Sequence, residues 1–152
     1  AQGARGTARA AQGNAVGAID DFTAALQADP NNVQALAGRG SARLDTGDTN
    51  GALEDLNQAV QLAPNTYDVR LQRGNARSRA GDLDGALADY DIALTLNPAG
   101  AAAYYNRAEV YQQRGDTMAA LDDYRQAADL YAQQGNAQGE REALQRLEEL
   151  QG

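Results

Sequence analysis

Apolar residues recur at helical spacing along the chain and are interrupted at regular intervals by glycine and proline. Between positions 49 and 62 they line one face of a helix, at Leu53, Leu56, Ala59 and Val60. Gly47 and Asp48 precede this segment and Pro64 follows it. Glycine ends helices, aspartate caps their N-termini and proline prevents their continuation. The segment 33–66 is therefore predicted to hold two helices, at about 33–46 and 49–62.

This pattern repeats every 34 residues. Four columns keep the spacing: Pro30, Pro64 and Pro98; Gly13, Gly47, Gly81 and Gly115; Ala18, Ala52, Ala86 and Ala120; and Ala25, Ala59, Ala93 and Ala127. Segments 33–66 and 67–100 share 13 of their 34 residues without a gap. A fixed period of this length is typical of stacked helical repeats. Further helices are predicted at about 1–12, 15–28, 67–80, 83–96, 101–114 and 117–133.

Composition adds that the core must be built from small side chains. Alanine accounts for 33 of the 152 residues, and aromatic residues for only 5%. Because alanine has the highest helix propensity and lets helices approach closely, this composition favours an all-α protein.

The residue types that are missing limit the chemistry. The chain contains no Cys, His, Lys or Trp, so the usual zinc ligand sets cannot form. Its two serines, Ser41 and Ser78, have no His or Lys base to activate them. A net charge of −8 opposes nucleic-acid binding, and the chain has no run of about 18 apolar residues that could cross a membrane. We expect no enzyme activity, metal or cofactor, and the compartment stays open.

The repeat resembles that of the tetratricopeptide repeat family. Segment 101–134 matches best, through Tyr104, Arg107, Ala108, Tyr111, Ala120, Tyr124 and Ala127. Two further columns agree: Gly6, Gly40, Gly74 and Ala108, and Phe22, Leu56, Tyr90 and Tyr124. The chain departs from the family at four positions where family members often have an aromatic residue and this chain has arginine: Arg9, Arg43, Arg70 and Arg77. The resemblance implies an all-α, right-handed superhelical α-solenoid with four units, at 1–32, 33–66, 67–100 and 101–134.

Residues 135–152 depart from the repeat. Ala143, Leu144, Leu147 and Leu150 form the apolar side of a helix at about 137–150, and charged residues occupy the rest. Stacked repeats leave the apolar face of their last unit bare, and a terminal helix with a polar outer side covers it. This segment is predicted to be the C-terminal capping helix.

Each unit carries an arginine and, 16 residues later, an aspartate: Arg5 and Asp21, Arg39 and Asp55, Arg73 and Asp89, Arg107 and Asp123. Sixteen residues correspond to one helix–turn–helix return, so each pair can meet between two helices, and arginine can bond a carboxylate through two N–H groups. We interpret them as structural pairs. The alternative is an anion-binding ladder joined by Arg9, Arg43 and Arg77. Adjacent carboxylates such as Glu54 and Asp55 point about 100° apart on a helix, which disfavours a metal site.

The resemblance implies that the first helix of each unit lines the concave side of the array. In unit 33–66 the packing face of that helix holds Leu36, Arg39, Gly40 and Arg43, and the opposite stripe stays free. The free stripe of three units contains Gln34, Ala37, Ser41, Leu44 and Asp45; Asp68, Leu71, Asn75, Ser78 and Arg79; and Ala102, Tyr105, Glu109, Gln112 and Gln113. Leu44, Leu71 and Tyr105 are predicted to be exposed anchors for a peptide. The alternative is an ordinary helix surface.

Two functions remain open. The first is a scaffold that binds a peptide or protein partner in this concave groove. The second is a structural spacer or self-assembly module excised from a larger protein, associating through its first unit, which lacks two residues of the repeat.

Family members that clamp a C-terminal carboxylate use Lys and Asn on this stripe. Only Asn75 matches, so that ligand is not expected here.

Overall fold

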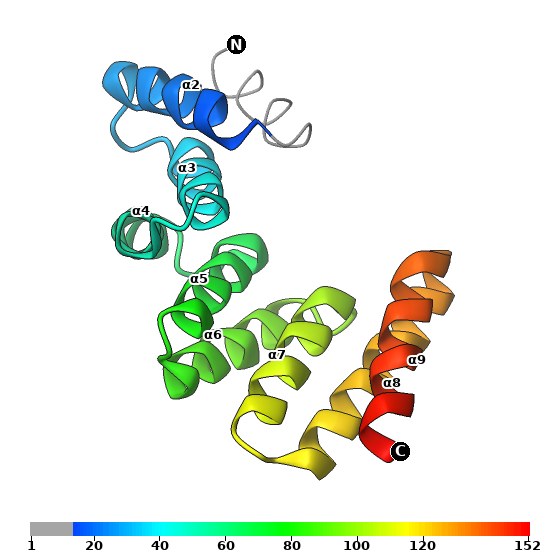
Figure 1. Ribbon diagram of the computed structural model, residues 1–152. Coiled ribbons are helices and arrows are strands. Elements are labelled where there is room, and N and C mark those ends of the chain that lie inside the picture. Colours follow the sequence, from blue (N-terminus) through cyan, green and yellow to red (C-terminus); the bar gives the residue numbers. More distant parts are fainter. Residues whose placement is uncertain (1–13) are drawn as a thin grey trace.

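The computed structural model describes residues 14–152, and the helix predicted at about 1–12 lies outside them (Figure 1). The described part contains eight helices and no strand: α2 (Ala15–Ala28), α3 (Val33–Asp45), α4 (Thr49–Leu62), α5 (Tyr67–Arg79), α6 (Leu83–Leu96), α7 (Ala101–Gln113), α8 (Thr117–Gln133) and α9 (Ala137–Gln151). Each predicted boundary in this part lies within one residue of the observed one. The protein is an all-α helical repeat solenoid, as its periodicity predicted.

The helices begin at the residues that the sequence pattern singled out. Asp48 Oδ1 accepts a hydrogen bond from the backbone N–H of Gly51 at 2.9 Å, and Asp82 Oδ1 accepts one from Gly85 at 2.9 Å. A Cβ at Gly51 or Gly85 would crowd the capping carboxylate, so glycine at these positions lets the aspartate lie close to the first turn of the helix. The helices before these caps end at glycines with φ angles of 89° and 86°, Gly47 and Gly81. Glycine adopts this left-handed conformation without steric cost.

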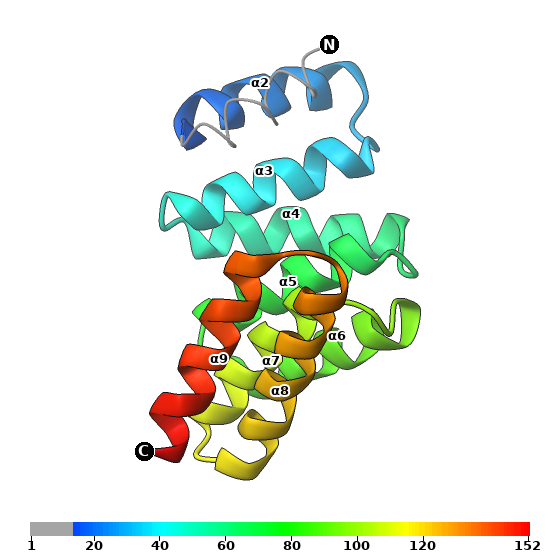
Figure 2. The same ribbon diagram turned by 90° about the vertical axis from the view of Figure 1, so that its right-hand side faces the viewer.

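The helices stack into a curved array (Figures 1 and 2). Each helix packs against the next, and α3 also contacts α5 while α5 contacts α7. The first helices of successive pairs therefore lie side by side and form one surface, on the inner side of the curve. Helices α2, α4, α6 and α8 each contribute a large residue with an exposed fraction of 1% or less: Phe22, Leu56, Tyr90 and Tyr124. A Cβ at Gly74 would come within 2.6 Å of the Tyr90 ring, so this small residue lets α5 and α6 approach closely.

Helix α9 packs against α8 at the end of the array. Its buried residues are Gly139, Ala143 and Leu147. Leu144, which the sequence pattern placed on the covered side, is instead 47% exposed, because successive residues of a helix point about 100° apart and Ala143 already faces α8. None of the helices within residues 14–152 combines the length and the apolar character needed to cross a membrane.

Candidate functional site

Three buried aspartates form a seam between the two helices of successive pairs. Each is at most 5% exposed, and each accepts two hydrogen bonds from the arginine 16 residues earlier. These pairs are Arg39–Asp55, Arg73–Asp89 and Arg107–Asp123, with N–O distances of 2.7 to 2.9 Å. The structural pairing predicted from the spacing is confirmed here, whereas Arg5 of the remaining pair lies outside the described residues. We refer to these contacts as the arginine–aspartate seam.

The seam extends beyond its pairs. Asp89 also accepts hydrogen bonds from Arg70 at 3.2 Å and Arg77 at 3.1 Å, and Asp55 accepts one from Arg43 at 3.0 Å. The remaining Nη1 groups of the paired arginines reach the preceding second helix: Arg39 to Thr23, Arg73 to Asn57 and Arg107 to Asp91. The hydrogen bonds to Asp55 raise the pKa of Arg39. Because the protein itself occupies these guanidinium groups, the seam favours the structural interpretation over an anion-binding ladder.

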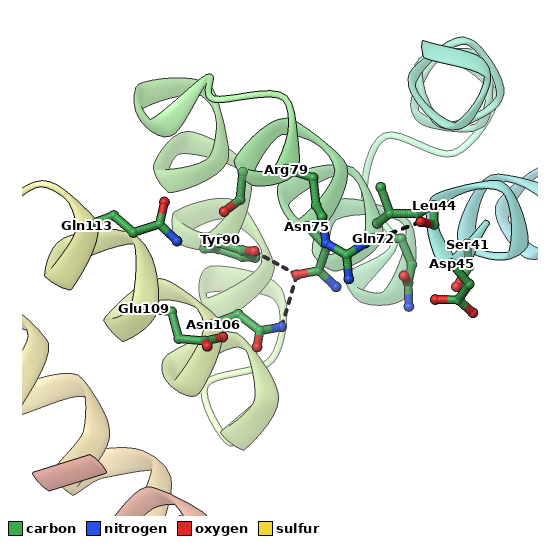
Figure 3. A pocket seen from close by; sticks show the side chains of 11 residues that line it. Ser41, Leu44, Asp45, Gln72, Asn75, Arg79, Tyr90, Asn106, Glu109 and Gln113 are labelled. Atoms are coloured by element: carbon green, nitrogen blue, oxygen red, sulfur yellow. Dashed lines mark hydrogen bonds between the residues drawn. The ribbon is translucent and has the colours of Figure 1, made fainter. Parts of the chain in front are cut away.

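A cavity of about 450 Å³ lies on the other side of α5, between α3, α5 and α7 (Figure 3). Most of its lining side chains are polar. The full lining consists of Ser41, Leu44, Asp45, Gln72, Asn75, Ser78, Arg79, Tyr90, Asn106, Glu109 and Gln113. A second cavity of about 730 Å³ adjoins it through Ser41 and Gln72. Its other lining residues are more apolar: Phe22, Val33, Gln34, Ala37, Gly38, Ala63, Thr66, Asp68 and Val69. We call the two cavities together the groove.

Asn75 is fixed in the first cavity by two neighbouring helices. Its Oδ1 accepts hydrogen bonds from the Tyr90 hydroxyl on α6 at 2.6 Å and from Asn106 Nδ2 on α7 at 2.9 Å (Figure 3). Both bonds use the oxygen. The NH₂ group of Asn75 donates to none of the described residues. Nearby, Arg79 Nη1 on α5 donates to the backbone oxygen of Leu44 on α3 at 3.2 Å. The groove therefore contains polar side chains that the fold holds in place, and the NH₂ group of Asn75 is a donor that a ligand can use.

Most of the sequence-predicted site residues line this groove. The first cavity contains Ser41, Leu44, Asn75, Ser78, Arg79 and Glu109, and the second contains Gln34 and Asp68. Leu71, Tyr105 and Gln112 line neither cavity. Sequence reasoning missed Gln72, Tyr90 and Asn106. Tyr90 is 1% exposed as a whole residue and belongs to a core cluster, and its hydroxyl reaches the edge of the cavity, where it donates to Asn75.

The prediction that Leu44 and Leu71 are exposed anchors is wrong. They are 6% and 8% exposed. Leu44 packs in a cluster with Leu56 and Ala76, and Leu71 packs in the cluster around Tyr90. The cluster of Leu44 includes Ala76 of α5, and that of Leu71 includes Ala103 of α7. Residues of the neighbouring first helices therefore help to cover both leucines.

The predicted anchor Tyr105 contacts the last helices of the array. Its ring meets the Tyr124 ring edge-on, with the centroids 5.4 Å apart, and the Arg146 guanidinium of α9 lies 6.0 Å from its centroid. Arg146 Nη2 also lies 3.4 Å from Glu109 Oε2. Burial raises the pKa of Glu109, and Arg146 opposes that shift. Helix α9 therefore covers part of Tyr105. Glu109 lines the first cavity and also contacts Arg146 of α9.

Several solved structures are similar to this chain over most of its length. MamA is 25% identical with a TM-score of 0.71, covering 96% of this chain and 94% of its own. The first TPR of Spaghetti (RPAP3), bound to the HSP90 peptide SRMEEVD, is 29% identical with a TM-score of 0.71, covering 75% of this chain and 90% of its own. YrrB, a TPR protein with an unusual peptide-binding site, is 26% identical with a TM-score of 0.75, covering 92% of this chain and 71% of its own.

The family assignment comes from sequence as well as from structure. No curated protein matches the chain. Tetratricopeptide repeat models match residues 4–66 and 101–134, and a model described as TPR repeat matches residues 74–115. These matches include most of the chain and agree with the helical repeats and the small-residue columns of the structure. The chain belongs to the tetratricopeptide repeat family.

Proposed function

We propose that the groove on α3, α5 and α7 binds an extended peptide or an unfolded segment of a partner protein, and that the chain acts as a non-catalytic scaffold. The observation that carries this proposal is the fixed orientation of Asn75. Tyr90 and Asn106 hold its oxygen, so its NH₂ group is prearranged to donate to a peptide carbonyl. A prearranged donor strengthens binding because little side-chain entropy is lost when the ligand arrives.

The rest of the groove suits the same kind of ligand. An extended backbone exposes N–H and C=O groups, and Ser41, Gln72 and Ser78 offer side-chain donors and acceptors along the cavities. The second cavity provides apolar contacts from Val33 and Val69 for a ligand side chain. These contacts replace the leucine anchors that the sequence analysis had proposed.

Similar proteins support a role in protein interaction. The RPAP3 domain binds an HSP90 peptide, and YrrB is described by its peptide-binding site. We further propose that the four units predicted from the sequence form the binding array and that residues 135–152 cap it. The self-association alternative concerns the first unit, and residues 1–13 of that unit lie outside the described part of the chain.

The test begins with a display selection of random decapeptides on the intact chain. The enriched peptides are then measured by fluorescence anisotropy against the wild type and Asn75→Ala. We expect Asn75→Ala to weaken binding about tenfold, which corresponds to the loss of one well-placed hydrogen bond. The matched control is Asn50→Ala on α4, an exposed residue outside both cavities, which should bind like the wild type.

Circular dichroism and thermal unfolding must show that Asn75→Ala remains folded, because the change also removes the partner of the Tyr90 hydroxyl. Enrichment of no peptide would overturn the proposal. Equal binding by the wild type and a folded Asn75→Ala variant would show that another surface is used.

A further inference from the structure

The groove carries more negative than positive charge. Asp45 and Glu109 line the first cavity and Asp68 lines the second. Among the described residues that line the two cavities, Arg79 is the one basic residue, and it donates to the backbone oxygen of Leu44. An acidic segment entering the groove would meet three carboxylates, so complementarity favours a basic ligand.

Glu109 is the carboxylate best placed to recognise a positive charge. It lies on α7 and faces the first cavity (Figure 3), and its side chain is 36% exposed. Its contact with Arg146 at 3.4 Å uses Oε2, and Oε1 accepts no hydrogen bond from the described residues. A carboxylate that is partly removed from water and holds its present cation at 3.4 Å gains when a closer cation takes that place.

Arg146 shows what kind of group this position accepts. Its guanidinium comes from α9 and lies within reach of both Glu109 and the face of the Tyr105 ring. A carboxylate beside an aromatic face is a favourable site for a guanidinium or ammonium group. The Arg146 side chain is 37% exposed and its contact with Glu109 is long. A pair of this kind contributes little stability, so it can open when a ligand enters.

We infer that Glu109 selects a ligand segment carrying an arginine or lysine side chain, and that Arg146 occupies the place of that side chain in the free protein. This inference rests on the proposed peptide-binding function and specifies its ligand. Arg146 is then an internal competitor, and its removal strengthens binding although it deletes a contact of the fold. The acidic peptide SRMEEVD is expected to bind poorly, because its carboxylates would face Asp45 and Glu109.

The experiment uses the decapeptides enriched on the intact wild-type chain and, for each, a version in which Arg or Lys is replaced by Gln. Affinities are measured for the wild type, Glu109→Gln and Arg146→Gln. The matched controls are Glu54→Gln on α4 and Arg141→Gln on α9, both exposed and outside the cavities. We expect the enriched peptides to contain Arg or Lys, and their Gln versions to bind the wild type about tenfold more weakly.

The same replacement should make little difference to Glu109→Gln, because the charged partner is then absent. Arg146→Gln should bind the basic peptides about threefold more tightly than the wild type, since the competing guanidinium is gone. Both control variants should bind like the wild type.

The possible failures are distinguishable. Enrichment of no peptide overturns the proposed function and this inference with it. Enriched peptides that lack basic residues, or that bind Glu109→Gln as tightly as the wild type, overturn the selectivity while leaving the groove as the binding site. Unchanged or weaker binding by Arg146→Gln overturns its role as a competitor.

Discussion

The two polar faces of α5 differ in how far the protein itself satisfies them. On the face towards α6, Arg70, Arg73 and Arg77 converge on Asp89, which is 1% exposed. On the face towards the groove, the NH₂ group of Asn75 has no acceptor among residues 14–152, and Arg79 is exposed. Both faces are rich in hydrogen-bonding groups, so polarity alone does not identify the binding face. The difference is that one face has used its donors within the fold and the other has kept some of them available.

Tyr90 connects these two faces. Its ring packs in the core of the α5–α6 pair, and its hydroxyl donates to Asn75 in the groove. Tyr90 thus reaches both faces, whereas Arg70, Arg73 and Arg77 of the seam line neither cavity. Variants on either face should therefore separate stability from binding.

The largest expected effect comes from removing the charge at the centre of the seam. Asp89→Asn keeps the side-chain volume but leaves three arginines around a neutral amide. Loss of one partner from a buried ion pair is strongly destabilising because the remaining charge is uncompensated. We expect the free energy of unfolding to fall by about 3 kcal/mol, measured by urea denaturation.

The matched control is Asp91→Asn on the same helix. Asp91 also bonds an arginine, Arg107 at 2.8 Å, but its side chain is 59% exposed. Its replacement should change the free energy of unfolding by no more than about 1 kcal/mol. Equal effects of the two substitutions would mean that the seam contributes no more than a surface ion pair.

The seam and the repeat could be predicted from sequence because both depend on spacing along the chain. The 34-residue columns determined the helix boundaries, and the 16-residue offset between Arg73 and Asp89 gave their pairing across one helical hairpin. Local chemistry predicted where helices end and begin: Gly47 ends one helix, and Asp48 caps the start of the next.

The groove was only partly predictable because it depends on how closely the helices approach. Helical periodicity placed Ser41, Asn75 and Glu109 on one surface. It could not show that the helix contacts would cover Leu44 and Leu71, since that depends on how closely the neighbouring helices pack around them. Nor could it show that Tyr90, a core residue by position, has a hydroxyl that reaches the groove from α6.

An intermediate effect is expected at this connecting residue. Tyr90→Phe keeps the ring but removes the hydroxyl that fixes Asn75. We expect a loss of about 1 kcal/mol in the free energy of unfolding, with weaker binding of the enriched decapeptides because Asn75 is no longer prearranged. Tyr111→Phe is the control, since no described group hydrogen-bonds its hydroxyl. Unfolding is measured in urea and binding by anisotropy; a stability loss without any loss of affinity would contradict the role assigned to Asn75.

The smallest expected effect is a change in the pH dependence of stability in alkali, at Tyr124, the equivalent tyrosine of the next pair. Tyr124 donates to Gln112 at 2.9 Å, and burial raises its pKa from 10.0 to about 12. Between these values the unfolded chain loses the phenolic proton while the folded chain keeps it, so the unfolded state binds fewer protons and stability falls as pH rises. Urea denaturation at several pH values from about 9 to 11 should show this decline, and tyrosinate absorbance should show a late-titrating group. In Tyr124→Phe the decline should be shallower, because the replaced side chain cannot ionise. An identical pH dependence in the two proteins would show that Tyr124 does not keep its proton in the fold, and that the core around it is open to water as the groove is.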